Sequence, residues 1–360
     1  MARLDLVDIA HSYLPRPSGP SDYALRPINL TWDDGGAYAL LGPSGSGKST
    51  LLNILSGLVV PSQGKLLFDR ADVTRLPTRN RNIAQVFQFP VIYDTMSVYD
   101  NLAFPLRNRG VDSAAVNQRV AQVADILELT PDLGKRASGL SADAKQRISM
   151  GRGLVRKDVA AILLDEPLTV IDPHLKWVLR RKLKQIHYEL AITLIYVTHD
   201  QIEALTFADK VVVMNNGTVL QQGSPQDLFE EPRHTFVGHF IGSPGMNLVA
   251  CARNGNGIVM DGQKLEFPAN IVAKANGARL TLGIRPEYVR LEDPTDAQAF
   301  NIVVDEVEQL GGYQLITAIV AGTRFMIKAP SDRVVTPGQG RTIWLPRTRT
   351  KLYVDDKMVD

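Results

Sequence analysis

The sequence has one cysteine, Cys251, and no long apolar run, and both features limit where the protein works. A single cysteine excludes an internal disulfide and fits a reducing compartment. The longest apolar runs, such as Val159–Leu164, are too short to span a bilayer, and the first ten residues alternate like a strand rather than a signal peptide. The net charge is only +2, so no broad basic surface for nucleic acid is indicated. We therefore expect a cytosolic protein, which can still dock on a partner in a membrane.

The pattern of the 360 residues changes near residue 235, and the length is sufficient for two domains. Before this point, the continuously apolar runs Gly36–Gly42, Ala160–Pro167 and Ile192–Asp200 are typical of strands buried in a parallel sheet, with helical patterns between them. After it, alternating and β-branched segments are separated by Gly, Pro and Asn turns. We predict an α/β domain over 1–235, with a helical subdomain at about 89–160, and a small β-barrel-like domain over 236–360.

The segment "GPSGSGKS", Gly42–Ser49, fits the phosphate-loop pattern in full, between an apolar strand and a helical pattern. Glycine allows successive backbone N–H groups to turn inward around phosphate oxygens, and the following helix directs its positive end at the same anion. Lys48 is expected to reach the β- and γ-phosphates, Ser49 to ligate Mg²⁺ and Thr50 to contact the α-phosphate. The full set of expected nucleotide-binding residues in this loop is Gly42, Pro43, Ser44, Gly45, Ser46, Gly47, Lys48, Ser49 and Thr50.

Four further polar residues follow apolar strands and complete a candidate hydrolytic site. In "ILLDEP", Asp165 is expected to hold Mg²⁺ and Glu166 to polarise the attacking water. A structural salt bridge would also explain this pair, but the phosphate loop favours the catalytic interpretation. Gln88 is placed to touch both the Mg²⁺ and the water, and His199 to hydrogen-bond the γ-phosphate.

In order and spacing, these motifs resemble the ATPase domains of ABC-type transporters. The segments "THDQIEALTFADKVVVMNNG", "FIGSPGMN" and "GIRPEYVRL" are similar to the ATPase subunits of maltose-type carbohydrate importers, over nearly the whole chain. The resemblance implies hydrolysis of ATP with Mg²⁺, coupled to solute import, and an OB-like C-terminal regulatory domain. It implies two ATPase subunits held by two membrane-spanning permease subunits, peripheral on the cytoplasmic face of the inner membrane. It further implies that an external solute-binding protein supplies the solute and that no nucleic acid takes part.

The resemblance also assigns roles that the local sequence does not. Tyr13 corresponds to the aromatic residue that stacks on adenine, and Asp172 in "TVIDPHLK" to the loop at the dimer interface. The segment after Gln88 is expected to form the groove that receives a short helix of a permease subunit. Its large apolar residues are Tyr93, Met96, Val98 and Phe104.

One motif departs from the family. Where the family has LSGGQ, which contacts the ATP held by the facing subunit, this chain has "LSADA", which keeps Ser141 but places Ala142 and Asp143 at the two glycines. Compared with glycine, alanine narrows the range of backbone angles that the turn can adopt. At roughly 5 Å and an effective dielectric near 20, one like-charge pair costs about 3 kcal/mol, which pairing of Asp143 with Lys145 would reduce.

The defect affects the site that holds the partner's ATP, so we expect a heterodimer whose second ATPase supplies a complete turn. Together with "LTVIDPHLK", this motif resembles one ATPase subunit of two-ATPase glycerol importers. An active homodimer in a sugar or glycerol-phosphate importer is the alternative. A P-loop kinase gives no reason for Gln88 and His199, and a nucleic-acid ABC ATPase would show coiled-coil insertions or basic tracts. A non-hydrolysing regulatory switch would be expected to lack Glu166 or His199.

Overall fold

The protein is described by a computed structural model, which covers residues 2–255, 257–274 and 279–359. The chain divides into two compact units, Met1–Pro225 and Gln226–Asp360. The boundary predicted at 235/236 falls in a helical stretch, where α7 (Pro225–Glu230) and α8 (Thr235–Phe240) precede the first strand of the second unit. Among the described residues, no helix combines the length and the apolar character needed to cross a membrane.

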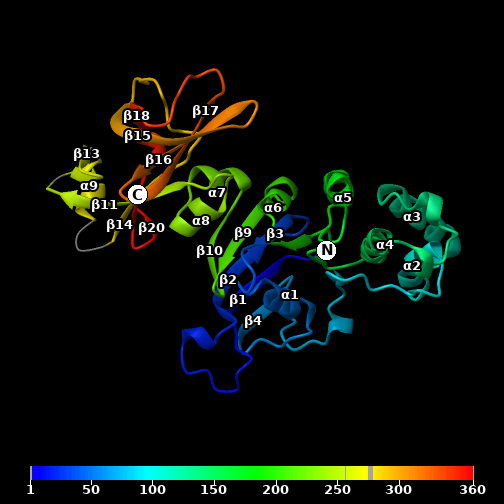
Figure 1. Cartoon of the computed structure of the whole chain (residues 1–360). Coiled ribbons are helices and arrows are strands. Elements are labelled where there is room, and N and C mark those ends of the chain that lie inside the picture. The colour runs from blue at the N-terminus through cyan, green and yellow to red at the C-terminus, as the bar shows by residue number, and fades with distance from the viewer. Residues whose placement is uncertain (1, 256, 275–278, 360) are drawn as a thin grey trace. The chain divides into compact units, whose positions relative to one another are not determined.

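The first unit is built on a six-stranded sheet in the order β10-β9-β3-β8-β7-β6 (Figure 1). Neighbouring strands from β9 to β6 are parallel, and β10 is antiparallel to β9. The strands are β3 (Ala37–Leu41), β6 (Ala84–Val86), β7 (Ile162–Asp165), β8 (Leu194–Thr198), β9 (Lys210–Asn215) and β10 (Thr218–Gly223).

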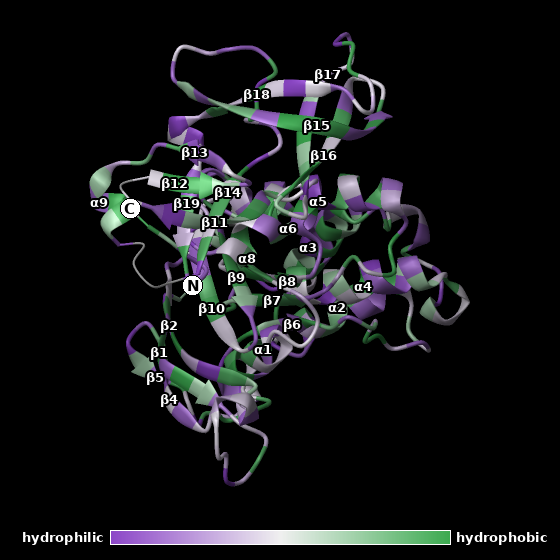
Figure 2. Cartoon of the chain, turned by 60° about the vertical axis from the view of Figure 1, so that its left-hand side comes forward, coloured by the Kyte–Doolittle hydropathy of each residue, from purple (hydrophilic) through white to green (hydrophobic). Residues whose placement is uncertain are grey.

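The central strands are apolar along their whole length because helices cover both faces of this sheet. Leu40, Leu163 and Ile195 are fully buried, and Figure 2 shows the hydrophobic colour along β7 and β8. On one face lies α1 (Lys48–Ser56); on the other lie α5 (Pro173–Leu190) and α6 (Gln201–Phe207) (Figure 1). Helices on both faces are the usual arrangement around a parallel sheet.

A second, four-stranded antiparallel sheet has the order β2-β1-β4-β5. In β2 the buried and exposed residues largely alternate, so one face of the sheet packs on the core and the other faces solvent. Trp32 of β2 is fully buried in a cluster with Leu51 and Leu52 of α1. The strands are β1 (Leu4–His11), β2 (Leu25–Trp32), β4 (Gln63–Phe68) and β5 (Ala71–Asp72).

Three helices between β6 and β7 form the helical subdomain: α2 (Val98–Arg107), α3 (Ser113–Ile126) and α4 (Ala142–Leu154). Each begins at a side chain that accepts a hydrogen bond from the first turn, namely Ser97, Asp112 and Ser141. The apolar residues of α3 at helical spacing, Val116, Val120 and Val123, are buried on one face.

The second unit consists of two antiparallel sheets in the orders β13-β12-β11-β14-β19-β20 and β17-β16-β15-β18. Phe300, Phe325 and Leu282 lie fully buried in its core. Its elements are β11 (Asn247–Asn254), β12 (Gly257–Met260), β13 (Gln263–Leu265), α9 (Ala269–Ala273), β14 (Leu280–Ile284), β15 (Ala297–Gln309), β16 (Tyr313–Val320), β17 (Thr323–Pro330), β18 (Gly340–Pro346), β19 (Lys351–Val354) and β20 (Lys357–Met358).

A fully buried arginine organises the start of the second unit. The guanidinium of Arg285 donates to the carbonyls of Phe229, Gly238, Ile241 and Leu228, and it lies over the Phe229 ring. Burial lowers the pKa of Arg285 to about 10. This one side chain therefore satisfies carbonyl groups at the ends of α7 and α8.

Arg285→Met should destabilise the second unit by about 3 kcal/mol, because it leaves several carbonyls without a donor while filling a similar volume. Urea-dependent hydrogen exchange of the β14 amides in the full chain measures this change. The exposed Arg290→Met is the matched control and should change the free energy of unfolding by less than about 0.5 kcal/mol. Equal effects of the two substitutions would contradict the role of Arg285.

Candidate functional site

The candidate site lies along one edge of the six-stranded sheet, where four neighbouring parallel strands end. The phosphate loop follows β3, His199 follows β8, Asp165 ends β7, and Gln88 lies just after β6. Parallel strands present their carboxyl ends at the same edge, which is where ligands bind in open α/β sheets. The strand order β3-β8-β7-β6 therefore gathers residues that are far apart in the sequence.

The phosphate loop has a backbone that only glycine adopts readily. Gly47 has a φ of +98°, and a Cβ placed there would lie 2.7 Å from the Ala24 carbonyl oxygen. Gly42 is equally constrained, since its Cβ would lie 2.2 Å from the Met214 carbonyl oxygen. The helix α1 starts immediately after Gly47, so its free N–H groups open into the loop.

Lys48 is buried and fills the inside of the loop. Its Nζ donates to the carbonyls of Gly42 (2.8 Å) and Pro43 (2.9 Å) and lies 3.4 Å from Ser46 Oγ. Burial lowers the pKa of Lys48, and the charges of Glu166 and Asp165 partly oppose this shift. A phosphate group would supply the counter-charge that the loop carbonyls provide only as dipoles.

The carboxylates of Asp165 and Glu166 are adjacent and partly buried at the end of β7. Burial raises the pKa of Asp165, the neighbouring Glu166 raises it further, and Lys48 lowers it. A divalent cation at Asp165 would offset this cost, so the residues fit a bound Mg²⁺. Ser49, the other expected ligand on α1, is exposed.

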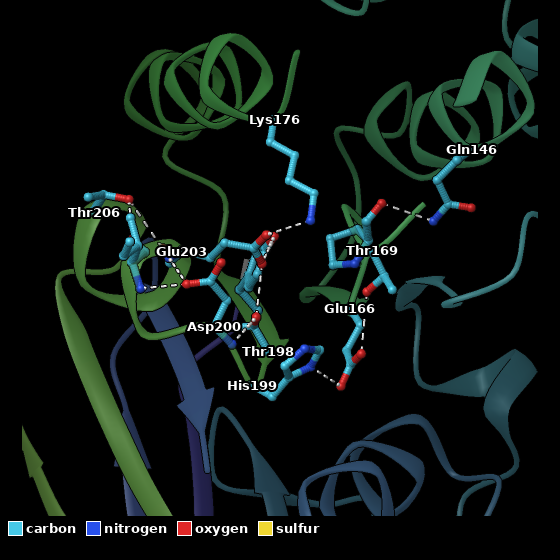
Figure 3. Close-up of polar contacts among 12 residues, drawn as sticks. Gln146, Glu166, Thr169, Lys176, Thr198, His199, Asp200, Glu203 and Thr206 are labelled. Atoms are coloured by element: carbon cyan, nitrogen blue, oxygen red, sulfur yellow. Dashed lines mark hydrogen bonds and ion pairs between the residues drawn. The ribbon is translucent and has the colours of Figure 1, made fainter. Parts of the chain in front are cut away.

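Glu166 contacts three polar side chains, of which Figure 3 labels His199 and Thr169. Its Oε2 accepts from Gln88 Nε2 and Thr169 Oγ1, both at 3.3 Å, and its Oε1 lies 3.1 Å from His199 Nδ1. The backbone of Glu166 has a φ of +43°, which is unfavourable for a residue with a side chain. The structure thus brings together Gln88, Glu166 and His199, and it adds Thr169, which has no sequence signal beyond its place three residues after Glu166.

A buried network supports the turn that carries His199, and the sequence analysis did not identify it. Glu203 of α6 accepts hydrogen bonds from Tyr196 (3.0 Å) and Thr198 (2.9 Å), and the hydroxyl of Thr198 accepts from the Asp200 amide (3.0 Å). Lys176 Nζ of α5 lies 3.8 Å from the Glu203 carboxylate (Figure 3). These bonds fix the backbone on both sides of His199. The signal was the acidic residue in "THDQIE", one turn after the histidine.

Tyr13 lies beside the loop, at the start of the helix that the loop opens. Its hydroxyl is 3.3 Å from Thr50 Oγ1, and its side chain is 62% exposed. The ring meets His11 edge to face at 4.5 Å between centroids. An exposed aromatic surface therefore stands next to Thr50, where an adenine could stack.

The family-specific residues Ser141, Asp143 and Asp172 are not brought to the phosphate loop of this chain. Ser141 and Asp172 cap α4 and α5 by accepting from the amides of Ala144 and His174. Because the capping groups are both exposed, they remain available to a facing subunit.

Asp143 pairs with Arg147 and not with Lys145. Asp143 Oδ2 accepts from Arg147 one helical turn later, at 3.0 and 3.1 Å, while Lys145 pairs with Asp94 at 3.1 Å. An i, i+4 pair lies on one helix face, whereas positions i and i+2 point apart. The Asp143 carboxylate therefore lies against Arg147 on the same face of α4, and this pairing partly neutralises its negative charge.

The predicted docking groove also needs one correction. Val98 is fully buried, because it starts α2 and faces the subdomain core, and it cannot contact a partner. Tyr93 is 40% exposed and packs on Phe104 with 4.8 Å between ring centroids. Beside them, a cavity of about 340 Å³ is lined by residues that include Val91, Phe104, Pro105 and Arg152.

Comparisons with known proteins cover both units. Residues 25–169 match the ABC transporter family, residues 242–289 the MalK OB fold domain, and residues 282–351 the TOBE domain. The chain is similar to the sn-glycerol-3-phosphate import ATP-binding protein UgpC of Jannaschia sp. (strain CCS1), at 38% identity over 94% of both chains. It is 36% identical to UgpC 2 of Agrobacterium fabrum (strain C58 / ATCC 33970), over 98% of this chain and 93% of the relative.

Two solved structures of ATP-binding cassettes resemble the chain. One is cbiO1 from Clostridium perfringens, part of the ABC transporter complex cbiONQ, with a TM-score of 0.57 and 29% identity over 63% of this chain and 90% of that chain. The other is a dimeric cassette in a post-hydrolysis state bound to ADP and Pi, with a TM-score of 0.54 and 25% identity over 62% and 98%.

Asp165→Asn tests the charge at this edge. The native pKa of Asp165 is raised above its ordinary 3.8, so the folded chain holds this proton more tightly than the unfolded chain. The free energy of unfolding should therefore fall as pH rises from 3.8 through the raised native pKa, and Asp165→Asn should lack this fall. Without nucleotide, the variant should melt at an equal or higher temperature at neutral pH.

With Mg²⁺ and ATP, Asp165→Asn should instead melt at a lower temperature than the wild type. The variant loses an ion ligand and with it the stabilisation that binding provides. Thermal melts across this pH range, with and without Mg²⁺–ATP, measure both effects. A variant that melts below the wild type at neutral pH without nucleotide would contradict the charge assignment.

Proposed function

Because the chain belongs to the family of ATP-binding import subunits of ABC transporters, we propose that its own phosphate loop and Glu166 hydrolyse the ATP that drives solute import. The chain is an ATPase of this type. The observation that carries the residue assignment is the position of the Glu166 carboxylate, hydrogen-bonded by Gln88 and paired with His199 at the strand ends beside the phosphate loop.

Nucleotide binding is assigned to the loop Gly42–Thr50 and to Tyr13. The backbone N–H groups and Lys48 hold the β- and γ-phosphates, while the Thr50 hydroxyl, already beside Tyr13, contacts the α-phosphate. The exposed ring of Tyr13 then stacks on adenine. The burial of Lys48 supports this assignment, because an anion is the natural partner for a desolvated ammonium group.

Mg²⁺ enters with ATP as part of the substrate, and Asp165, Ser49 and Gln88 are the residues assigned to hold it. When bound, the ion neutralises phosphate charge and orients the phosphates. Asp165 contributes a carboxylate whose ionised form is unfavourable without a cation. Gln88 contributes its amide from the adjacent strand end, where it already contacts Glu166.

Glu166 is assigned as the group that accepts a proton from the attacking water. Gln88 and Thr169 orient the carboxylate through Oε2, and His199 contacts Oε1 until its ring turns to the γ-phosphate. His199 is exposed and follows β8, so its ring can turn from Glu166 to the γ-phosphate. General-base assistance of this kind contributes about 10²–10⁴ in rate.

We assign to a second, different ATPase the turn that completes this site. In this chain the corresponding turn has Ala142 and Asp143 as the first two residues of α4, and they offer a less open backbone than two glycines. The pairing of Asp143 with Arg147 weakens the like-charge argument, so the backbone constraint carries more of the expected defect. The homodimer remains the alternative that the experiment below distinguishes.

The solute is proposed to be a polyol or polyol phosphate of the glycerol 3-phosphate class. The support is the names of relatives that are 36–38% identical over more than nine-tenths of this chain. The chain itself works as a peripheral subunit on the cytoplasmic face, where the groove beside Phe104 receives a permease helix and an external binding protein delivers the solute.

Glu166→Gln should preserve ATP binding and slow hydrolysis in the assembled transporter by about 10²–10⁴, because the amide cannot accept the proton. Lys48→Ala is the contrast: it should weaken ATP binding itself by removing a charge from the phosphates. Turnover, nucleotide affinity and uptake of labelled glycerol 3-phosphate are measured for both. Unchanged turnover in Glu166→Gln would remove Glu166 from the mechanism.

Replacement of both Ala142 and Asp143 by glycine should raise ATP hydrolysis by the isolated full chain at least about tenfold, since it restores an open turn in any homodimer. Asp143→Asn removes the charge alone and separates it from the backbone effect. An ATPase with an intact turn should activate the wild-type chain, and this gain should need Glu166. Rapid, cooperative hydrolysis by the wild-type chain alone would favour the homodimer and refute the second ATPase.

A further inference from the structure

The amide of Gln146, on α4, joins two backbone segments of the candidate site. Its side chain is fully buried, and Nε2 donates to the carbonyls of Phe87 and Pro167, both at 3.1 Å. Figure 3 shows the Gln146 side chain directed toward the segment that follows Glu166. Phe87 directly precedes Gln88, and Pro167 directly follows Glu166, so one side chain holds the backbone beside both groups.

The Gln146 amide contributes hydrogen-bond donors, and packing alone does not require it. Within the described part of the chain, Gln146 Oε1 is buried and has no hydrogen-bond partner. A buried polar atom without a partner is unfavourable, and a methionine would fill the same volume without it. What a methionine lacks is the NH₂ group, which satisfies two carbonyls in segments that leave β6 and β7.

Gln146 also belongs to the helix whose first turn faces the second subunit's nucleotide in the proposed function. Ser141 caps α4 five residues earlier, a separation of about 7.5 Å along a rigid helix. Moreover, Arg147, the next residue, fastens α4 to the segment just after α3 through the carbonyls of Leu127 and Glu128. A shift of the capped end of α4 therefore displaces the Gln146 amide with it.

We infer that Gln146 is a positioning residue that aligns Gln88 with Glu166 and couples their alignment to the position of the turn at Ser141. This inference rests on the proposed role of Glu166 in hydrolysis. It divides α4 between two roles: the first turn of α4 serves the facing subunit, whereas Gln146 serves this chain's own site.

Gln146→Met tests the inference in the full chain, because it keeps the volume and removes both donors. Within the assembled transporter, kcat should fall about tenfold to a hundredfold, while KM for ATP stays within about twofold, since the phosphate loop is untouched. Hydrogen exchange of the full chain alone should become faster in the segments 87–91 and 166–170 but not in α1. Exchange does not depend on turnover, so a failure of the proposed function can be told from a failure of this inference.

Gln85→Met is the matched control. Gln85 lies three residues before Gln88 on β6, and its buried Nε2 has no hydrogen-bond partner among the described residues, so the same substitution removes no bond. In the full chain alone, it should leave hydrogen exchange in both segments near the wild-type rates; kcat is not compared for this control, because Gln85 lines the cavity assigned to the permease helix. Unchanged exchange in both segments of Gln146→Met, wild-type kcat despite faster exchange, or equally fast exchange in Gln85→Met would each overturn the inference.

Discussion

Charge at the carboxyl end of the parallel sheet is the constraint on which the site depends. Two adjacent carboxylates, Asp165 and Glu166, and one buried ammonium, Lys48, lie where β3, β7 and β8 end, and water reaches them only in part. Without ligand, burial disfavours the charge of both Lys48 and Asp165. In the proposed function, the charges of phosphate and Mg²⁺ would compensate both groups.

Contacts from neighbouring elements hold the side chains around these charged groups in place. Glu166 adopts an unfavourable backbone conformation and is fixed by Gln88, Thr169 and His199. The turn of His199 is in turn supported from α6 by Glu203, through Thr198. In the proposed role of Glu166 as the general base, its carboxylate needs a defined direction, and contacts from the strand ends on both sides of β7 provide it.

Much of the fold and part of the site could be predicted from the sequence. The fold class, the family and the ATPase activity are confirmed by the comparisons, because phosphate-loop glycines and apolar strands ending in polar residues are local patterns. Contacts between segments that are far apart in the chain leave no such local pattern in the sequence. The bridges from Gln146 to Phe87 and Pro167 join residues far apart in the chain, and the burial of Val98 depends on how α2 packs. The pairing of Asp143 with Arg147 follows from helical geometry, which brings residues four apart onto one face once α4 is known to be a helix.

The roles of the site residues and the participation of a second, different ATPase stay predictions. Both depend on which subunit's loop holds the ATP that is hydrolysed. Vanadate trapping of a photoreactive ATP analogue in the assembled transporter answers this question, with the labelled peptides identified by mass spectrometry. The account predicts one trapped nucleotide per pair of ATPase subunits, cross-linked to this chain near Tyr13 and the loop Gly42–Thr50. Two trapped nucleotides per pair, or label confined to the other ATPase, would contradict it.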